Sequence, residues 1–161
     1  MIEIEVEDPA WTQALPEAAS LARAAAQAAL KLVPGQLQGA AADEPEVAIL
    51  LTSDAAVQAL NGRFRGKDQP TNVLSFPAAA NPEGHLGDIA LAYGVCAREA
   101  AEQGKPMGGH LQHLVAHGVL HLLGYDHMRD DEAEAMEGLE RAVLAGLGVP
   151  DPYAAGEGEH G

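Results

Sequence analysis

The chain has 161 residues, enough for one domain with a single hydrophobic core. Hydrophobic residues make up 47% of it, which excludes an intrinsically disordered protein. The net charge of −15, from 9 basic and 24 acidic residues, argues against a protein that holds a long nucleic acid by charge alone.

The N-terminal residues and the single cysteine narrow the possibilities further. The start, MIEIEVEDPAW, has no basic region followed by an apolar one, and no apolar run is long enough to span a membrane. We therefore expect a cytoplasmic protein. Cys96 cannot form an internal disulfide or belong to a thiolate zinc cluster, so any metal ion is expected to have histidine or carboxylate ligands.

Hydrophobic periodicity, helix caps and turn residues predict the element order β-α-β-α-β-β-α-α-α. The predicted strands cover residues 2–6, 46–52, 72–77 and 87–93. The predicted helices are an alanine-rich one between Pro16 and Pro34, one from Ser53 or Asp54 to about Gly62, and three over residues 94–103, 108–123 and 130–146. Four strands and about five helices predict a single layered α+β domain with a small mixed sheet over residues 1–152, and a disordered tail over 153–161.

The sequence HGVLHLLGYDH, residues 117–127, has the histidine spacing of metzincin zinc proteases. His117 and His121 are four residues apart and project from one face of a helix. Gly124 is suited to end that helix, which lets the chain bring His127 back over the same face. Three imidazoles and one open position are the composition of a catalytic zinc site, so we predict one zinc ion per chain on this C-terminal helix.

The catalytic glutamate of the protease pattern is replaced by Gly118. Amide hydrolysis is therefore disfavoured, because it needs a general base and a proton for a poor leaving group. A phosphodiester is a better candidate substrate, since a metal ion and an arginine can neutralise charge on phosphoryl oxygens. Asp126 is a candidate for orienting one of the ligands. His113 is expected to orient a ligand or face the substrate, and His110 is expected at the surface.

The segment RFRGK, residues 63–67, contains three of the nine basic residues. It predicts a mobile cationic loop in which Phe64 is able to stack on a base, with a solvated turn as the alternative. The strand that contains HLGDIAL is expected to run along the metal cleft and to present an unpaired edge to an extended substrate.

Three segments, NGRFRGKDQPTNVLSFP, LGDIAL and HGVLHLLGYDHMRDDEAEAME, together resemble the bacterial YbeY family of metallo-endoribonucleases. The resemblance implies that His117, His121 and His127 bind zinc, and that Arg65 takes part in catalysis together with His117. It also implies single-strand-specific RNA cleavage in maturation of the 16S rRNA 3′ end and in 70S ribosome quality control. The implied partners are components of the small ribosomal subunit and an assembly GTPase.

Two other functions are compatible with the same residues. One is a non-catalytic ribosome-assembly factor whose zinc is structural. The other is a zinc hydrolase that acts on amides or esters, with Asp126 or an acid of RDDEAE as its base. The sequence leaves open the general base, the cleavage site, the physiological metal and the oligomeric state, and it does not distinguish hydrolysis from attack by a 2′-hydroxyl.

Overall fold

The computed structural model describes residues 2–32, 46–66, 69, 71–78, 85–123 and 130–149. Within these residues, four strands form one sheet in the order β1-β2-β4-β3. The strands are β1 (Ile2–Val6), β2 (Glu46–Thr52), β3 (Val73–Pro77) and β4 (His85–Ala92). The helices are α1 (Ala10–Ala14), α2 (Ala18–Leu32), α3 (Asp54–Arg65), α4 (Tyr93–Gln103), α5 (Met107–Leu122) and α6 (Asp130–Gly146). The predicted tail over 153–161 lies outside the described residues.

The predicted α+β class with a small mixed sheet is confirmed. Strand β1 pairs in parallel with β2, β2 pairs in parallel with β4, and β3 is antiparallel to β4. The expectation that β4 has an unpaired edge is wrong, because β4 has hydrogen-bonded neighbours on both sides. Its sequence ends in the nearly continuous apolar run IALA, which is typical of a central strand that is covered on both faces.

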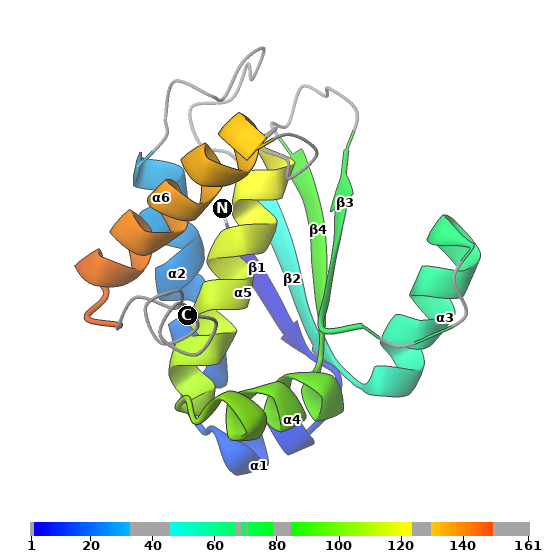
Figure 1. Cartoon of the computed structure of the whole chain (residues 1–161). Coiled ribbons are helices and arrows are strands. Elements are labelled where there is room, and N and C mark those ends of the chain that lie inside the picture. Colours follow the sequence, from blue (N-terminus) through cyan, green and yellow to red (C-terminus); the bar gives the residue numbers. More distant parts are fainter. Residues whose placement is uncertain are drawn as a thin grey trace.

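The helices cover the two faces of the sheet unequally. Figure 1 shows α2, α5 and α6 on one side of the sheet and α3 on the other. Alanines at helical spacing make one face of α2 flat, so that α5 can approach closely. These alanines are fully buried: Ala18, Ala22, Ala25, Ala26 and Ala29. The Gln112 side chain of α5 donates a hydrogen bond to the carbonyl of Leu21, which ties the two helices together.

The short helix α1 was not predicted from the sequence. It places Trp11 in the core, where its ring packs edge-on against Tyr93 with 5.4 Å between centroids. Trp11 Nε1 donates a hydrogen bond of 3.0 Å to the carbonyl of Thr52, at the end of β2. Because a five-residue helix is stabilised by tertiary packing and hardly at all by propensity, periodicity gives no clear signal for it.

Helix α3 is longer than predicted, which changes the surroundings of the basic residues. It begins at the predicted cap, where Ser53 accepts a hydrogen bond from the Ala56 amide. It continues through Gly62 and ends at Arg65, because Gly66, with φ of 69°, adopts the left-handed conformation that stops a helix. Arg63 is therefore helical, and the expectation of a cationic loop that begins at residue 63 is wrong.

Gly87 allows β4 to lie close to both β3 and α5. Its φ of 151° is rare for any residue with a side chain. A Cβ built there would lie 2.4 Å from the carbonyl oxygen of Phe76 and 2.7 Å from Leu122 Cδ2. The glycine of the LGDIAL segment is thus required by packing between the sheet and the helix that carries the histidines.

We expect Gly87→Ala to lower the free energy of unfolding by at least about 2 kcal/mol, through overpacking and the positive φ. Gly138→Ala is the matched control, since a Cβ at Gly138 meets nothing within 4 Å inside α6. The control is expected to raise stability by about 0.5–1 kcal/mol, because alanine favours a helix interior. Urea denaturation measures both, and equal effects of the two substitutions would contradict the packing role of Gly87.

Candidate functional site

His117 and His121 lie next to each other on α5, as their spacing predicts. Their ring centroids are 4.8 Å apart and the ring planes meet at 74°. The third predicted ligand, His127, and the neighbouring Asp126 lie outside the described residues. Over the part of the chain that is described, no three histidine, cysteine or acidic side chains are arranged so that they could hold a metal ion together. Two imidazoles of the predicted set are therefore together, on the last two turns of the helix.

Gly118, the position of the protease glutamate, faces the sheet. A Cβ built on it would lie 3.0 Å from Ile89 Cδ1 and 3.2 Å from Ser75 Oγ. Residue 118 is buried, and α5 packs against β3 and β4 at this point. A side chain here would require Ile89 or Ser75 to shift by a few tenths of an ångström, so the packing disfavours a protease-like general base at this position.

Glu140, on α6, is the functional candidate that sequence reasoning missed. Its side chain is 0% exposed, and Oε2 lies 3.2 Å from Nδ1 of His117. The residue stands on the apolar stripe of α6, four residues after Met136 and three before Val143, which are both buried. An acid at a position where helical periodicity requires an apolar side chain is the signal that would have identified it.

His113 joins the same cluster one helical turn before His117. Its Nε2 lies 2.6 Å from Glu140 Oε1, so the carboxylate lies between two histidine rings. This contact places His113 behind one of the predicted ligands, on the α6 side of the helix. Of its two expected roles, the geometry favours the one in which it helps to orient a ligand.

His110 was expected at the surface, and this expectation is wrong. Its side chain is 4% exposed, with Nε2 2.9 Å from Glu99 Oε1 on α4. Burial lowers the pKa of His110 more than the nearby Glu99 carboxylate raises it, so the ring stays neutral at neutral pH. Asn72 also donates to Glu99, at 3.0 Å. This polar cluster joins the residue before β3 to α4 and α5, one helical turn before His113.

The only cysteine is not suited to metal binding. Cys96 is buried on α4, and burial raises the pKa of its thiol far above the ordinary range. Its Sγ lies 3.6 Å from the carbonyl of Asn72. The Cys96 thiol is therefore part of the hydrophobic core and is not a candidate ligand. The histidines remain the candidate ligands.

Arg65 is separated from the histidine pair. It is the last residue of α3, and its side chain lies outside the described residues, as do Lys67 and Asp68. In Figure 1 the end of α3 stands apart from α5, with β3 and β4 between them. The roles of Arg65 and His117 in catalysis therefore stay predictions.

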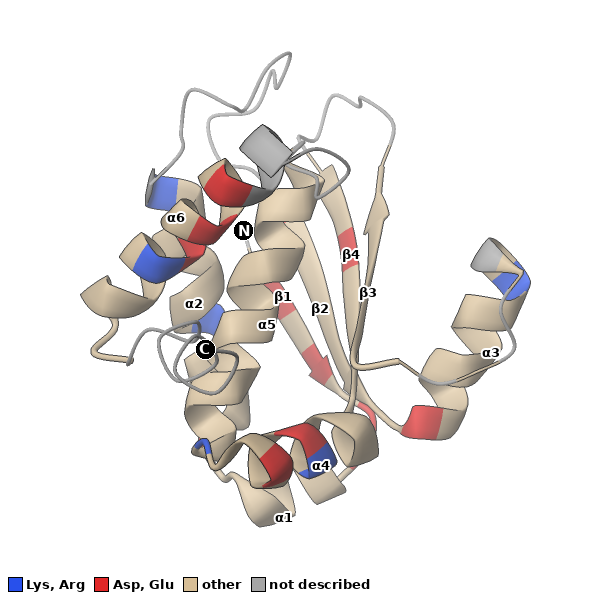
Figure 2. Cartoon of the chain, in the orientation of Figure 1, with Lys and Arg blue, Asp and Glu red and all other residues tan. Residues whose placement is uncertain are grey.

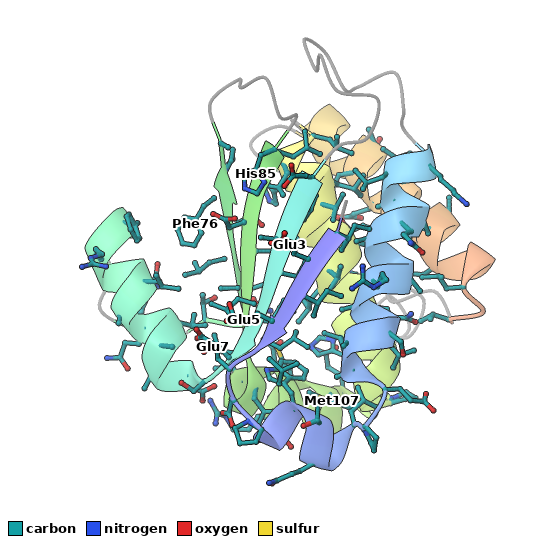
Figure 3. The ribbon with its side chains drawn as sticks, turned by 180° about the vertical axis from the view of Figure 1, so that it is seen from behind. Glu3, Glu5, Glu7, Phe76, His85 and Met107 are labelled. Carbon is teal, nitrogen blue, oxygen red and sulfur yellow. The ribbon has the colours of Figure 1, made fainter. Side chains whose placement is uncertain are left out.

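A groove of about 1270 Å³ lies between α3 and the outer face of the sheet. Its floor includes a row of residues that are aligned across the four strands: Glu3, Ala48, Asp88 and Phe76. Phe64 of α3 is 62% exposed and packs edge-on against Phe76, with 5.5 Å between centroids. Figure 3 looks onto this face, with Glu3 and Glu5 on β1 and Glu7 just after its end.

Among the described residues, as in the whole chain, acidic residues outnumber basic residues. Figure 2 shows acidic residues on β1, β4, α4 and α6, whereas basic residues are few and scattered over α2, α3, α4 and α6. The groove itself is lined by three acids, Glu3, Glu5 and Asp88, and by one base, Arg23. Arg23 already donates a hydrogen bond to the carbonyl of Ile2. The groove therefore combines apolar side chains with three carboxylates, two of them on the edge strand β1.

The described donor set fits a zinc ion. Two imidazoles lie on one helical face, and one of them is contacted through its second nitrogen by a buried carboxylate. Carboxylate, histidine and metal in this order are the usual arrangement of a zinc ligand and the group that orients it. The arrangement would hold the ion through His117 and His121, together with the predicted ligand His127.

The match to a family model decides the relationship of this chain to known proteins. The model described as endoribonuclease YbeY matches residues 8–148. The chain belongs to the endoribonuclease YbeY family. A YbeY endoribonuclease of Rhizorhabdus wittichii is 50% identical over 98% of this chain and 99% of its own length. Another, of Azorhizobium caulinodans, is 51% identical over 95% of this chain and 96% of its own.

The fold is also found among solved structures. The solution structure of TM1509 from Thermotoga maritima covers 91% of each chain with a TM-score of 0.56 and 24% sequence identity. At this identity the likeness supports the YbeY fold and no finer property. None of the helices in the described ranges is long and apolar enough to cross a membrane.

The contacts of Gly118 with the sheet lead to a prediction for a variant that introduces the glutamate of the protease pattern. We expect Gly118→Glu to lower the free energy of unfolding by about 1–3 kcal/mol or more, because it overpacks the contact with Ile89 and buries a charge. It is expected to add neither peptidase activity nor RNA cleavage. Gly118→Ala is the control and should cost less. Urea denaturation and cleavage assays on peptide and RNA substrates measure these effects, and enhanced cleavage in Gly118→Glu would contradict this assignment.

Proposed function

We propose that this protein is a zinc-dependent endoribonuclease specific for single-stranded RNA. The observation that carries the proposal is the pair of adjacent imidazoles, His117 and His121, on α5 of a chain that belongs to the endoribonuclease YbeY family. His117, His121 and His127 would hold the ion. When bound, zinc supplies Lewis acidity that stabilises negative charge on a phosphoryl oxygen.

Arg65 is proposed to neutralise phosphate charge on the bound RNA strand. An arginine at the end of α3 presents a planar guanidinium that can form two hydrogen bonds to one phosphate. Because the end of α3 stands apart from α5, this contact is proposed along the strand and not as a ligand of the ion. Phe64, which is exposed beside Arg65, offers an aromatic surface for a base of the same strand.

The position of Gly118 supports RNA over an amide as the substrate. Amide hydrolysis by a zinc enzyme of this histidine spacing relies on a glutamate at this position. Here the position is filled by the contact between α5 and the sheet. The alternative of a zinc hydrolase for amides or esters is therefore disfavoured. The alternative of an assembly factor with a structural zinc is distinguished from a nuclease by the variants below.

Two single substitutions separate metal binding from phosphate binding. We expect His121→Ala to abolish zinc binding and RNA cleavage together. Arg65→Glu is expected to keep zinc and to lower cleavage by about 10²–10³-fold, the usual cost of losing one group that stabilises transition-state charge. Zinc content is measured by mass spectrometry, and cleavage is measured on a labelled single-stranded RNA with protein that is free of other nucleases.

The matched controls are His85→Ala, on β4 outside the site, and Arg63→Glu, two residues before Arg65 on the same helix. Both are expected to keep zinc and cleavage nearly unchanged. If RNA cleavage survives in both His121→Ala and Arg65→Glu, the catalytic assignment is wrong, which favours the assembly factor with a structural zinc.

We further propose that the protein acts in the cytoplasm on the 3′ end of 16S rRNA and in quality control of 70S ribosomes. A protein with a net charge of −15 gains little from counterion release on RNA, so most of its affinity must come from a partner. A groove lined by apolar side chains and three carboxylates suits a basic protein segment that also carries apolar residues. Small-subunit ribosomal proteins have this chemistry, and an assembly GTPase is a second candidate partner.

We expect the double substitution Glu3→Lys and Glu5→Lys to weaken binding to the small ribosomal subunit by at least about fivefold, because it reverses two of the three acidic charges that line the groove. Zinc content should not change. The charge-matched control is Glu17→Lys with Glu102→Lys, since both residues are exposed and neither lines the groove. Co-sedimentation with purified subunits measures binding, and equal losses in both double variants would show that net charge alone is responsible.

A further inference from the structure

Glu140 is an acidic side chain in the core of the protein, where acids are rarely found. It is fully buried on α6, and its two oxygens face two different histidines of α5. Oε1 lies 2.6 Å from His113 Nε2, and Oε2 lies 3.2 Å from His117 Nδ1. The contact joins residues that are 23 and 27 positions apart in the sequence, so it exists only because α6 packs against α5.

Burying this carboxylate is unfavourable unless its charge is compensated. Moving an ionised carboxylate out of water costs far more than two neutral hydrogen bonds return. Packing alone would be served better by leucine or methionine, which occupy the neighbouring buried positions Met136 and Leu144 on the same helix. A buried acid that contacts a predicted metal ligand is therefore better explained by a role at the metal centre than by packing.

The contact also selects the tautomer of His117. An ionised carboxylate can only accept hydrogen bonds, so a ring nitrogen that faces it carries the hydrogen. His117 Nδ1 faces Glu140, which makes Nδ1 the N–H nitrogen and gives Nε2 the lone pair. A metal ion needs that lone pair. Glu140 thereby prepares the ring for metal binding before any ion arrives.

His113 completes the arrangement from the other side of the carboxylate. Its Nε2 donates to Oε1, so the carboxylate is held at both oxygens and cannot turn away from His117. Since His113 and His117 are one helical turn apart, their rings meet Glu140 from the same face of α5. The position of the carboxylate is thus determined by two contacts instead of one.

We propose that Glu140 is a positioning residue of the metal centre, which holds His117 in the Nδ1–H tautomer and assigns Nε2 to the ion, with His113 bracing the carboxylate. The proposal rests on the zinc binding proposed above. It differs from a purely structural role for Glu140, in which the carboxylate would only join α5 to α6 and its loss would lower stability without a specific effect on metal affinity.

The test uses Glu140→Gln, which keeps the shape of the side chain but can no longer accept from both histidines. We expect its zinc affinity to fall by about 10–100-fold, the usual effect of losing a group that orients a ligand. The melting temperature of the zinc-free variant should stay within a few degrees of the wild type, because the buried charge has been removed. Competition with a chromophoric chelator measures the affinity, and calorimetry measures the melting temperature.

Glu134→Gln is the matched control, because Glu134 is exposed on the same helix. It should bind zinc as the wild type does. Unchanged zinc affinity in Glu140→Gln would overturn the proposal. So would a fall in affinity that merely follows a large loss of zinc-free stability, since that result shows a structural role.

A second measurement needs neither a variant nor a metal. Nitrogen-15 NMR of the imidazole rings in zinc-free wild-type protein should show His117 with its hydrogen on Nδ1. A hydrogen on Nε2 would overturn the proposal. If the wild type binds no zinc, the proposed function fails, yet the tautomer still decides the role of Glu140, so the two failures are distinguishable.

Discussion

The close approach of α5 to the sheet at Gly118 determines how the rest of the site is arranged. The helix lies so near to β3 and β4 that a Cβ at residue 118 would be 3.0 Å from Ile89 Cδ1 and 3.2 Å from Ser75 Oγ. Because His117 and His121 stand about 100° and about 60° around the helix from Gly118, on the same side of it, their rings project beside this contact. The glycine that takes the place of the protease base is thus also the residue at which α5 contacts the sheet.

The side of α5 that carries His113 and His117 meets α6, and there the packing includes a charge. Glu140 would be a poor choice for stability alone, because a buried carboxylate loses its hydration. Proteins keep such groups where function needs them. The same helix pair therefore combines ordinary apolar contacts, through residues such as Met136, with one polar contact that bears on metal chemistry.

The face of the sheet opposite α5 is more acidic and less covered by helices. Helix α3 covers it only partly, which leaves a groove lined by apolar side chains and three carboxylates. The histidine pair lies on the other side of the sheet. The fold therefore places the proposed metal centre and the proposed partner surface on opposite faces of the sheet, and a partner bound in the groove would supply the RNA affinity that a net charge of −15 does not.

The sequence by itself determined the strands, five of the six described helices, and the neighbouring positions of His117 and His121, because these depend on contacts within a few residues along the chain. The end of α3 was misplaced because both Gly62 and Gly66 can stop a helix, and only the fold selects one of them. The tertiary structure alone decided the burial of His110, the pairing of β4 on both sides and the contact of Glu140 with His117. These features arise from packing between distant segments, which no local pattern records.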